Sequence, residues 1–96
     1  MNKRALVADK REAIFEAAQR HGAASIRVFG SVARGDESAG SDIDFLVRME
    51  PGRSLLDMGA LLLDLQELLQ CKVDLVSEGG LRPRFRDRAL RDALAL

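Results

Sequence analysis

The chain has 96 residues, 47% of them hydrophobic, which suits a modest core and predicts a single domain over residues 1–96. Its 15 lysine and arginine residues equal its 15 aspartate and glutamate residues, and the resulting net charge of zero argues against general nucleic-acid binding. The lone cysteine, Cys71, allows no intrachain disulfide and suits a reducing cytoplasm, and no apolar run is long enough to cross a membrane.

The first third of the chain predicts a helix, a strand and a short helical turn. Residues 3–21 place apolar side chains at helical spacing, and we expect His21 to be a helix-end residue without a catalytic role. Residues 25–29 alternate between two faces, as a strand does. The strand ends at Gly30, and Ser31 is a suitable N-cap for the helical turn that follows.

Two acidic residues open the second predicted strand. Residues 35–41 are rich in glycine, serine and acids and predict a loop, which leads into a strand over residues 42–49. Because successive side chains of a strand point to opposite faces, Asp42 and Asp44 share one face. Residues 50–52 have the sequence Glu-Pro-Gly and predict a turn after this strand.

The longest predicted helix covers residues 54–70. Ser54 is a suitable N-cap, and Asp57 follows three residues later in a pattern that resembles a capping box. Nine residues of this segment are leucine or methionine, and its polar stripe is narrow. Such a helix either lies within the core or also covers a partner, and the sequence leaves both possibilities open.

A third acid lies in the last predicted strand, residues 72–76, where Asp74 has apolar neighbours on both sides. A final helix is expected to begin near Pro83, because proline suits a first helical turn. The apolar stripe of this helix would consist of Phe85, Ala89, Leu90, Ala93 and Leu94. The arginines between these residues form either a solvated face or a contact with triphosphate, substrate or partner.

The order of these elements predicts the fold class. The order is helix, strand, helical turn, strand, helix, strand and helix. This order suits an α/β (α+β) sandwich, in which helices flank a sheet of about three strands. The sheet can be mixed, and the sequence does not settle the order of its strands.

The three acids suggest metal-dependent phosphate chemistry. Asp42 and Asp44 point the same way, and Asp74 has the alternation to join them if its strand is the neighbour of theirs. Carboxylates held close together repel one another, and their oxygens suit a hard cation such as Mg²⁺. Three carboxylates could hold two metal ions, an arrangement that stabilises both the attacking and the leaving oxygen of an in-line displacement.

The Gly30-Ser31 pair supplies a candidate phosphate cradle. Gly30 lacks a side chain, so a triphosphate can approach the backbone closely, and the Ser31 hydroxyl can donate a hydrogen bond. Arg34 lies one turn further on, where it either contacts phosphate or is solvated. Asp74 is the candidate general base that accepts a proton from an attacking hydroxyl. A Gly-Ser turn alone, or an Asp-x-Asp strand alone, is common in proteins, and only their combination with the later Asp indicates this chemistry.

The combination resembles the nucleotidyltransferase superfamily with the polymerase-beta-like catalytic core, whose pattern is Gly-Ser, about ten residues, Asp-x-Asp and a later Asp. Residues 30–35 (GSVARG) and 41–44 (SDID) are most similar to the minimal nucleotidyltransferase (MNT) antitoxin group. The resemblance covers almost the whole chain. It implies that Asp42 and Asp44 hold Mg²⁺, that Asp74 completes the site, and that the Gly-Ser pair holds the triphosphate.

The resemblance also implies an activity and a partner. Members of this group are similar to antitoxins paired with HEPN-type ribonuclease toxins, and some transfer AMP from ATP to a tyrosine hydroxyl of the toxin. Two other functions remain open. The chain could neutralise its toxin by covering it, without catalysis, or it could transfer a nucleotide to RNA or a small molecule. Zero net charge argues against RNA, and the lack of the added domain found in larger relatives argues against a small molecule.

Overall fold

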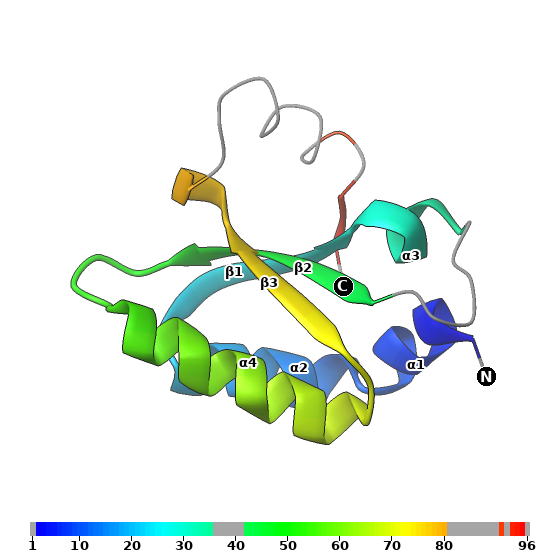
Figure 1. Ribbon diagram of the computed structural model, residues 1–96, viewed down its shortest axis with the longest axis horizontal. Helices are drawn as coiled ribbons and strands as arrows, with labels where there is room; N and C mark the ends of the chain where they lie inside the picture. Colours follow the sequence, from blue (N-terminus) through cyan, green and yellow to red (C-terminus); the bar gives the residue numbers. More distant parts are fainter. Residues whose placement is uncertain (1, 36–41, 81–90, 92, 96) are drawn as a thin grey trace.

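The computed structural model describes residues 2–35, 42–80, 91 and 93–95, and Figure 1 shows how their helices and strands are arranged. In chain order the elements are α1 (Lys3–Asp9), α2 (Arg11–Arg20), β1 (Ala23–Phe29), α3 (Gly30–Arg34), β2 (Ile43–Met49), α4 (Leu55–Leu69), β3 (Val73–Ser77), the 3-10 turn η1 (Glu78–Gly80) and β4 (Leu94–Ala95). The predicted fold class, a small mixed sheet flanked by helices, is confirmed.

Among the described residues the sheet is mixed, and its four strands lie in the order β3-β2-β1-β4. The long strands β1 and β2 pair antiparallel, whereas β2 and β3 pair parallel. The two-residue strand β4 adds an antiparallel pairing to the other edge of β1. The parallel pair brings the start of β3 beside the start of β2, where the predicted acids lie.

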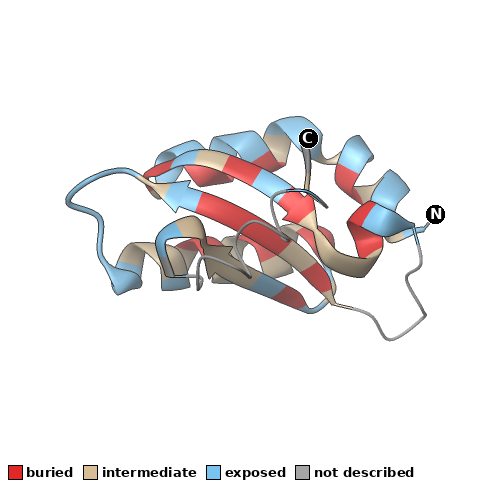
Figure 2. Cartoon of the chain, turned by 90° about the horizontal axis from the view of Figure 1, so that it is seen from above, coloured by how far each residue is buried: buried red, intermediate tan, exposed pale blue. Residues whose placement is uncertain are grey.

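Helices α2 and α4 cover one face of the sheet, and α3 follows directly from the end of β1 (Figure 1). Side chains from these helices and from the inward face of the strands form one hydrophobic cluster. Its members Ile14, Ile43, Phe45, Leu61 and Leu65 have no exposed surface. Figure 2 shows this burial concentrated along the strands and on the sides of the helices that face them.

Two sequence predictions at the ends of the chain need correction. The predicted helix over residues 3–21 is interrupted at Lys10, whose φ of −97° and ψ of 14° separate α1 from α2. The predicted final helix lies mostly outside the described residues, but its last apolar position, Leu94, belongs to β4 instead. There, backbone pairing with Val28 of β1 takes the place of helical hydrogen bonds.

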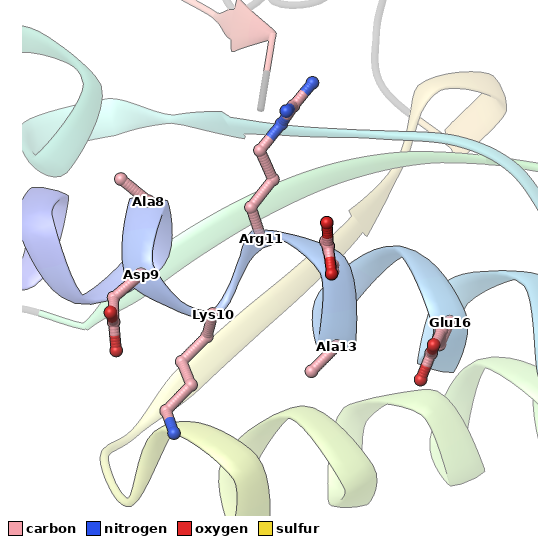
Figure 3. Close-up of a pocket in the computed structure, with 7 residues that line it drawn as sticks. Ala8, Asp9, Lys10, Arg11, Ala13 and Glu16 are labelled. Atoms are coloured by element: carbon pink, nitrogen blue, oxygen red, sulfur yellow. The ribbon is translucent and has the colours of Figure 1, made fainter.

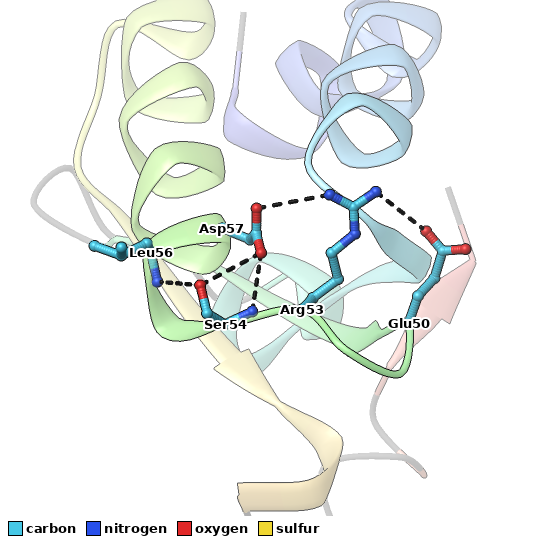
Figure 4. A network of polar contacts seen from close by, with 5 residues as sticks. All are labelled: Glu50, Arg53, Ser54, Leu56 and Asp57. Atoms are coloured by element: carbon cyan, nitrogen blue, oxygen red, sulfur yellow. Dashed lines mark hydrogen bonds and ion pairs between the residues drawn. The ribbon is translucent and has the colours of Figure 1, made fainter.

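Helix α4 begins as predicted. The Ser54 side chain accepts a hydrogen bond from the Leu56 backbone amide, and the Asp57 carboxylate accepts one from the Ser54 amide (Figure 4). This reciprocal capping box satisfies donors that the first turn of a helix leaves unpaired. Although α4 is rich in leucine, no helix among the described residues is long and apolar enough to cross a membrane.

Candidate active site

The structure brings the predicted acids together at one end of the parallel strand pair. Asp44 of β2 and Asp74 of β3 are register partners, so their side chains lie next to each other on one face of the sheet. Asp42 directly precedes β2, where the Ile43 backbone amide donates a hydrogen bond to the Lys72 carbonyl. The condition that the sequence left open, that β3 is the neighbour of β2, is therefore met.

The carboxylate of Asp44 is influenced electrostatically by the other two acids. Asp42 and Asp44 are half-buried and Asp74 is exposed. Burial raises the pKa of Asp44, and repulsion from Asp74 and then from Asp42 raises it further, whereas Arg34 lowers it. The site is therefore a cluster of like charges in which Arg34 gives partial compensation, and such a cluster favours binding of a cation.

Gly30 lies against one of these carboxylates. Its φ of 74° is in the left-handed region, and a β-carbon built on it would lie 2.5 Å from Oδ2 of Asp44. This position therefore excludes side chains for two reasons, backbone conformation and lack of space. The sequence predicts close approach of a phosphate to Gly30, whereas the neighbour of Gly30 in the structure is the Asp44 carboxylate.

The neighbouring residues of α3 differ in part from expectation. Ser31 is half-buried in the first turn of α3, and the N-cap position belongs to Phe29, which makes no side-chain capping bond. The predicted capping role of Ser31 is therefore wrong. Arg34, in the last turn, is exposed and close enough to Asp44 to influence its pKa.

Sequence reasoning missed the contribution of α1 to the surroundings of the site. The pKa of Cys71, just before β3, is raised by burial, lowered by Lys3 and raised by Asp42, which places all three residues near one another. An Arg4 guanidinium nitrogen lies 3.8 Å from where a β-carbon of Gly35 would be. No local sequence signal could reveal that α1 lies near the site, because the residues of α1 are distant from the site acids in the sequence.

The metal-binding role of the three aspartates stays a prediction. Among the described residues, no group of three or more His, Cys, Asp or Glu side chains is arranged to hold a metal ion. Mg²⁺, however, usually takes only one or two carboxylates from a protein and completes its shell with water and substrate phosphates. The oxygen donors of Asp42 and Asp44 fit an ion of that kind.

One hollow of about 500 Å³ lies at the break between α1 and α2 (Figure 3). Its lining is mostly charged and includes Asp9, Lys10, Arg11, Glu12 and Glu16. None of the predicted site residues lines this hollow.

Comparison with known proteins identifies the family of this chain. The sequence pattern of the nucleotidyltransferase domain family matches residues 10–96. The chain belongs to this family. Within the family, a relative from Thermococcus cleftensis, named protein adenylyltransferase MntA, is 38% identical over 82% of this chain and 80% of its own length. The chain is thus a nucleotidyltransferase.

Two solved structures share the fold. A candidate minimal nucleotidyltransferase is 48% identical and superposes with a TM-score of 0.90, covering 99% of this chain and 97% of its own. A toxin–antitoxin structure with AMP-PNP superposes with a TM-score of 0.75 over 88% of this chain and 69% of its own. Its identity of 21% supports common architecture only.

Proposed function

We propose that this nucleotidyltransferase transfers AMP from ATP to a hydroxyl group of a partner protein. The observation that carries the proposal is the register pairing of Asp44 with Asp74, together with Gly30 packed against Asp44. Phosphoryl and nucleotidyl transfer depend mainly on positioning and on charge stabilisation, which such a cluster provides. The name of the MntA relative, protein adenylyltransferase, supports AMP as the transferred group and a protein as the acceptor.

The triphosphate of ATP is assigned to Gly30, Ser31 and Arg34. Ser31 lies in the first turn of α3, where its hydroxyl can donate a hydrogen bond to a phosphate oxygen. Arg34 is exposed and lies one turn further along the same helix, on the same side as Ser31, so its guanidinium can bind a second phosphate oxygen. An arginine between the nucleotide and Asp44 would also reduce repulsion between the carboxylates and the phosphates.

Mg²⁺ is assigned to Asp42 and Asp44, with Asp74 completing a site for two ions. Ionised Asp44 is disfavoured by burial and by its acidic neighbours, and a bound cation would remove that penalty. When bound, the ions supply neutralisation of phosphate charge and stabilisation of the attacking and leaving oxygens. The protein's part is to hold its carboxylates at a fixed spacing on two hydrogen-bonded strands.

Asp74 is assigned as the general base, because it is exposed beside Asp44 and can reach an approaching hydroxyl. As Asp74 takes the hydroxyl proton, the acceptor oxygen forms a bond to the α-phosphorus of ATP. The bond from the α-phosphorus to the bridging oxygen breaks, and pyrophosphate leaves with its electron pair. The product is an AMP ester of the acceptor hydroxyl.

The acceptor is assigned to a tyrosine of a HEPN-type ribonuclease toxin, so that the chain acts as an antitoxin in the cytoplasm. This assignment follows from the resemblance to the MNT antitoxin group. It agrees with the fold shared with a toxin–antitoxin structure that holds AMP-PNP. AMP on a catalytic or binding surface of the toxin would add bulk and negative charge where the toxin engages RNA.

Intact-mass spectrometry tests the proposal. The chain is incubated with ATP, Mg²⁺ and the protein encoded beside it, and an AMP-sized mass increase on that protein is expected. The Asp42→Asn/Asp44→Asn variant should lose the increase. The control variant Asp9→Asn/Glu12→Gln removes two exposed carboxylates at the hollow of Figure 3 and should keep it.

Three results would contradict parts of the proposal. Transfer by the Asp42→Asn/Asp44→Asn variant would reject the assigned site. A stable complex without any mass increase would favour neutralisation by binding alone. Labelled nucleotide on RNA or on a small molecule, with none on protein, would reject the acceptor class.

A further inference from the structure

Two arginines lie on the same face of the sheet as the site acids. Arg48 comes four residues after Asp44 on β2, and alternation along the strand turns both side chains to one face. Arg27 of β1 shares this face, because its register partner is Leu46, two residues after Asp44. The residues before and after each arginine pack in or against the hydrophobic cluster on the other face. Arg27 and Arg48, the arginine pair, therefore point away from the core.

The side chains of the arginine pair are exposed and make no ion pair or hydrogen bond with any of the described residues. By contrast, Arg20 pairs with Asp64, and Arg53 pairs with Glu50 and Asp57. As diagonal neighbours on adjacent strands, the two arginines of the pair have Cα atoms about 7–8 Å apart, near enough for their like charges to repel. Their charges therefore add nothing to the stability of the fold, and an anionic ligand would relieve the repulsion.

With ATP bound as proposed above, the acceptor approaches from the end of the site where the arginine pair lies. The pyrophosphate of ATP then lies towards Gly30 and Ser31, at the start of α3 (Figure 1). In an in-line displacement the attacking oxygen enters opposite the leaving oxygen, and so from the side away from α3. On that side, Arg27 and Arg48 are about 7 and 13 Å along the strands from the row of Asp44. The arginine pair therefore lies where the acceptor, and not the triphosphate, is expected.

We propose that the arginine pair binds acidic side chains of the acceptor protein, an inference that rests on the function proposed above. Carboxylates are suitable ligands, because a guanidinium can donate two parallel hydrogen bonds to one carboxylate. Such an acceptor presents carboxylates about 7 and 13 Å from its reactive hydroxyl, which match the distances of Arg27 and Arg48 from the row of Asp44. Because the arginines and the site acids belong to the same hydrogen-bonded strands, binding of these carboxylates also orients the hydroxyl towards Asp74.

The position of the arginine pair distinguishes an acidic protein from two other anions. The β- and γ-phosphates of ATP are assigned to the far side of the site acids, next to Ser31 and Arg34. A nucleic acid carries a continuous row of phosphates and favours a broad basic surface, whereas this chain has no excess of positive charge. Two carboxylates on a protein surface need only two cations, which the arginine pair supplies.

Steady-state kinetics of AMP transfer to the protein encoded beside the chain test the proposal. Arg27→Glu/Arg48→Glu should raise the KM for that protein at least about 10-fold, because it places carboxylates opposite carboxylates. The KM for ATP, and kcat at saturating acceptor, should stay within about threefold of the wild-type values, since only binding of the acceptor is weakened. The conservative variant Arg27→Lys/Arg48→Lys keeps the charge without the planar guanidinium, and its acceptor KM should lie between those of the wild type and the charge reversal.

The matched control is Arg11→Glu/Arg20→Glu, which makes the same change of charge at two exposed positions of α2, a helix on the other face of the sheet. This variant should keep the wild-type KM for the acceptor, and circular dichroism verifies that both charge reversals fold. Added salt should raise the acceptor KM of the wild-type chain but not that of Arg27→Glu/Arg48→Glu, because it screens attraction in the first and repulsion in the second.

The outcomes separate this proposal from the proposed function. An acceptor KM that is unchanged in Arg27→Glu/Arg48→Glu would overturn the role of the arginine pair and leave AMP transfer to a protein in place. A rise in the KM for ATP instead would overturn it by assigning the pair to the nucleotide, and transfer to RNA alone would overturn it by changing the class of acceptor. A wild-type chain that transfers no AMP to protein would reject the proposed function and this role with it.

Discussion

Carboxylates are used in two opposite ways in this molecule. At the start of β2 and β3, Asp44 faces other acids, and burial together with repulsion raises its pKa. Between α2 and α4, the pKa of Asp64 is lowered, first by a hydrogen bond with His21 and also by Arg20. The first arrangement opposes ionisation of Asp44 in the folded chain, and the second favours ionisation of Asp64.

The contacts at the α2–α4 junction show what a structural carboxylate looks like. The His21 Nε2 and Asp64 Oδ2 atoms are 2.5 Å apart, and an Arg20 guanidinium nitrogen is 3.2 Å from the same oxygen. Asp57 likewise accepts a hydrogen bond from the Ser54 backbone amide, which lowers its pKa (Figure 4). Carboxylates that hold elements together are matched with donors, whereas Asp44 of the candidate site has two other acids as neighbours.

The largest effect on the stability of the fold is expected from Gly30→Ala. The added methyl group would overlap the Asp44 carboxylate, and the backbone would remain in a conformation unfavourable to alanine. We expect a loss of about 1–3 kcal/mol in the free energy of unfolding, measured by urea denaturation. Nucleotide transfer should fall about 100-fold or more, because displacement of a catalytic group by 1 Å has an effect of that size.

Gly52→Ala is the matched control for this prediction. Gly52 has a similar positive φ of 87°, but a β-carbon there would meet nothing within 4 Å. This variant should lose about 1 kcal/mol from backbone conformation alone and keep its activity. Equal losses of stability in the two variants would contradict the close contact between Gly30 and Asp44.

A smaller effect on stability is expected from Asp44→Asn, which should stabilise the fold rather than destabilise it. A raised folded-state pKa means that Asp44 stabilises the fold only while protonated, and this stability is lost as the pH rises through that pKa. At neutral pH, asparagine should therefore raise Tm by a few degrees while abolishing transfer. The gain should disappear as the pH falls below 3.8, the ordinary value for aspartate, and thermal unfolding at several pH values measures it.

The smallest effect on stability is expected from Asp64→Asn, which should destabilise the fold slightly, in contrast to Asp44→Asn. A lowered folded-state pKa means that ionised Asp64 stabilises the fold above the ordinary value of 3.8, and this stability is lost as the pH falls through the lowered pKa. The variant should have a slightly lower Tm at neutral pH and unchanged transfer. The same thermal series measures the difference, and a Tm deficit that persists below the lowered pKa would contradict the charge argument.

The sequence by itself determined the local features of this protein. Alternation placed Asp42 and Asp44 on one face, and the residues after Ser54 identified the start of α4, because strand and helix periods act over a few residues. Only the tertiary structure decided that β3 lies beside β2, so that Asp74 meets Asp44, and that Gly30 packs against the same carboxylate. It also paired Leu94 with β1 rather than placing it in a helix. Hydrogen bonds between strands join residues far apart in the chain, and no local periodicity encodes which strands become neighbours.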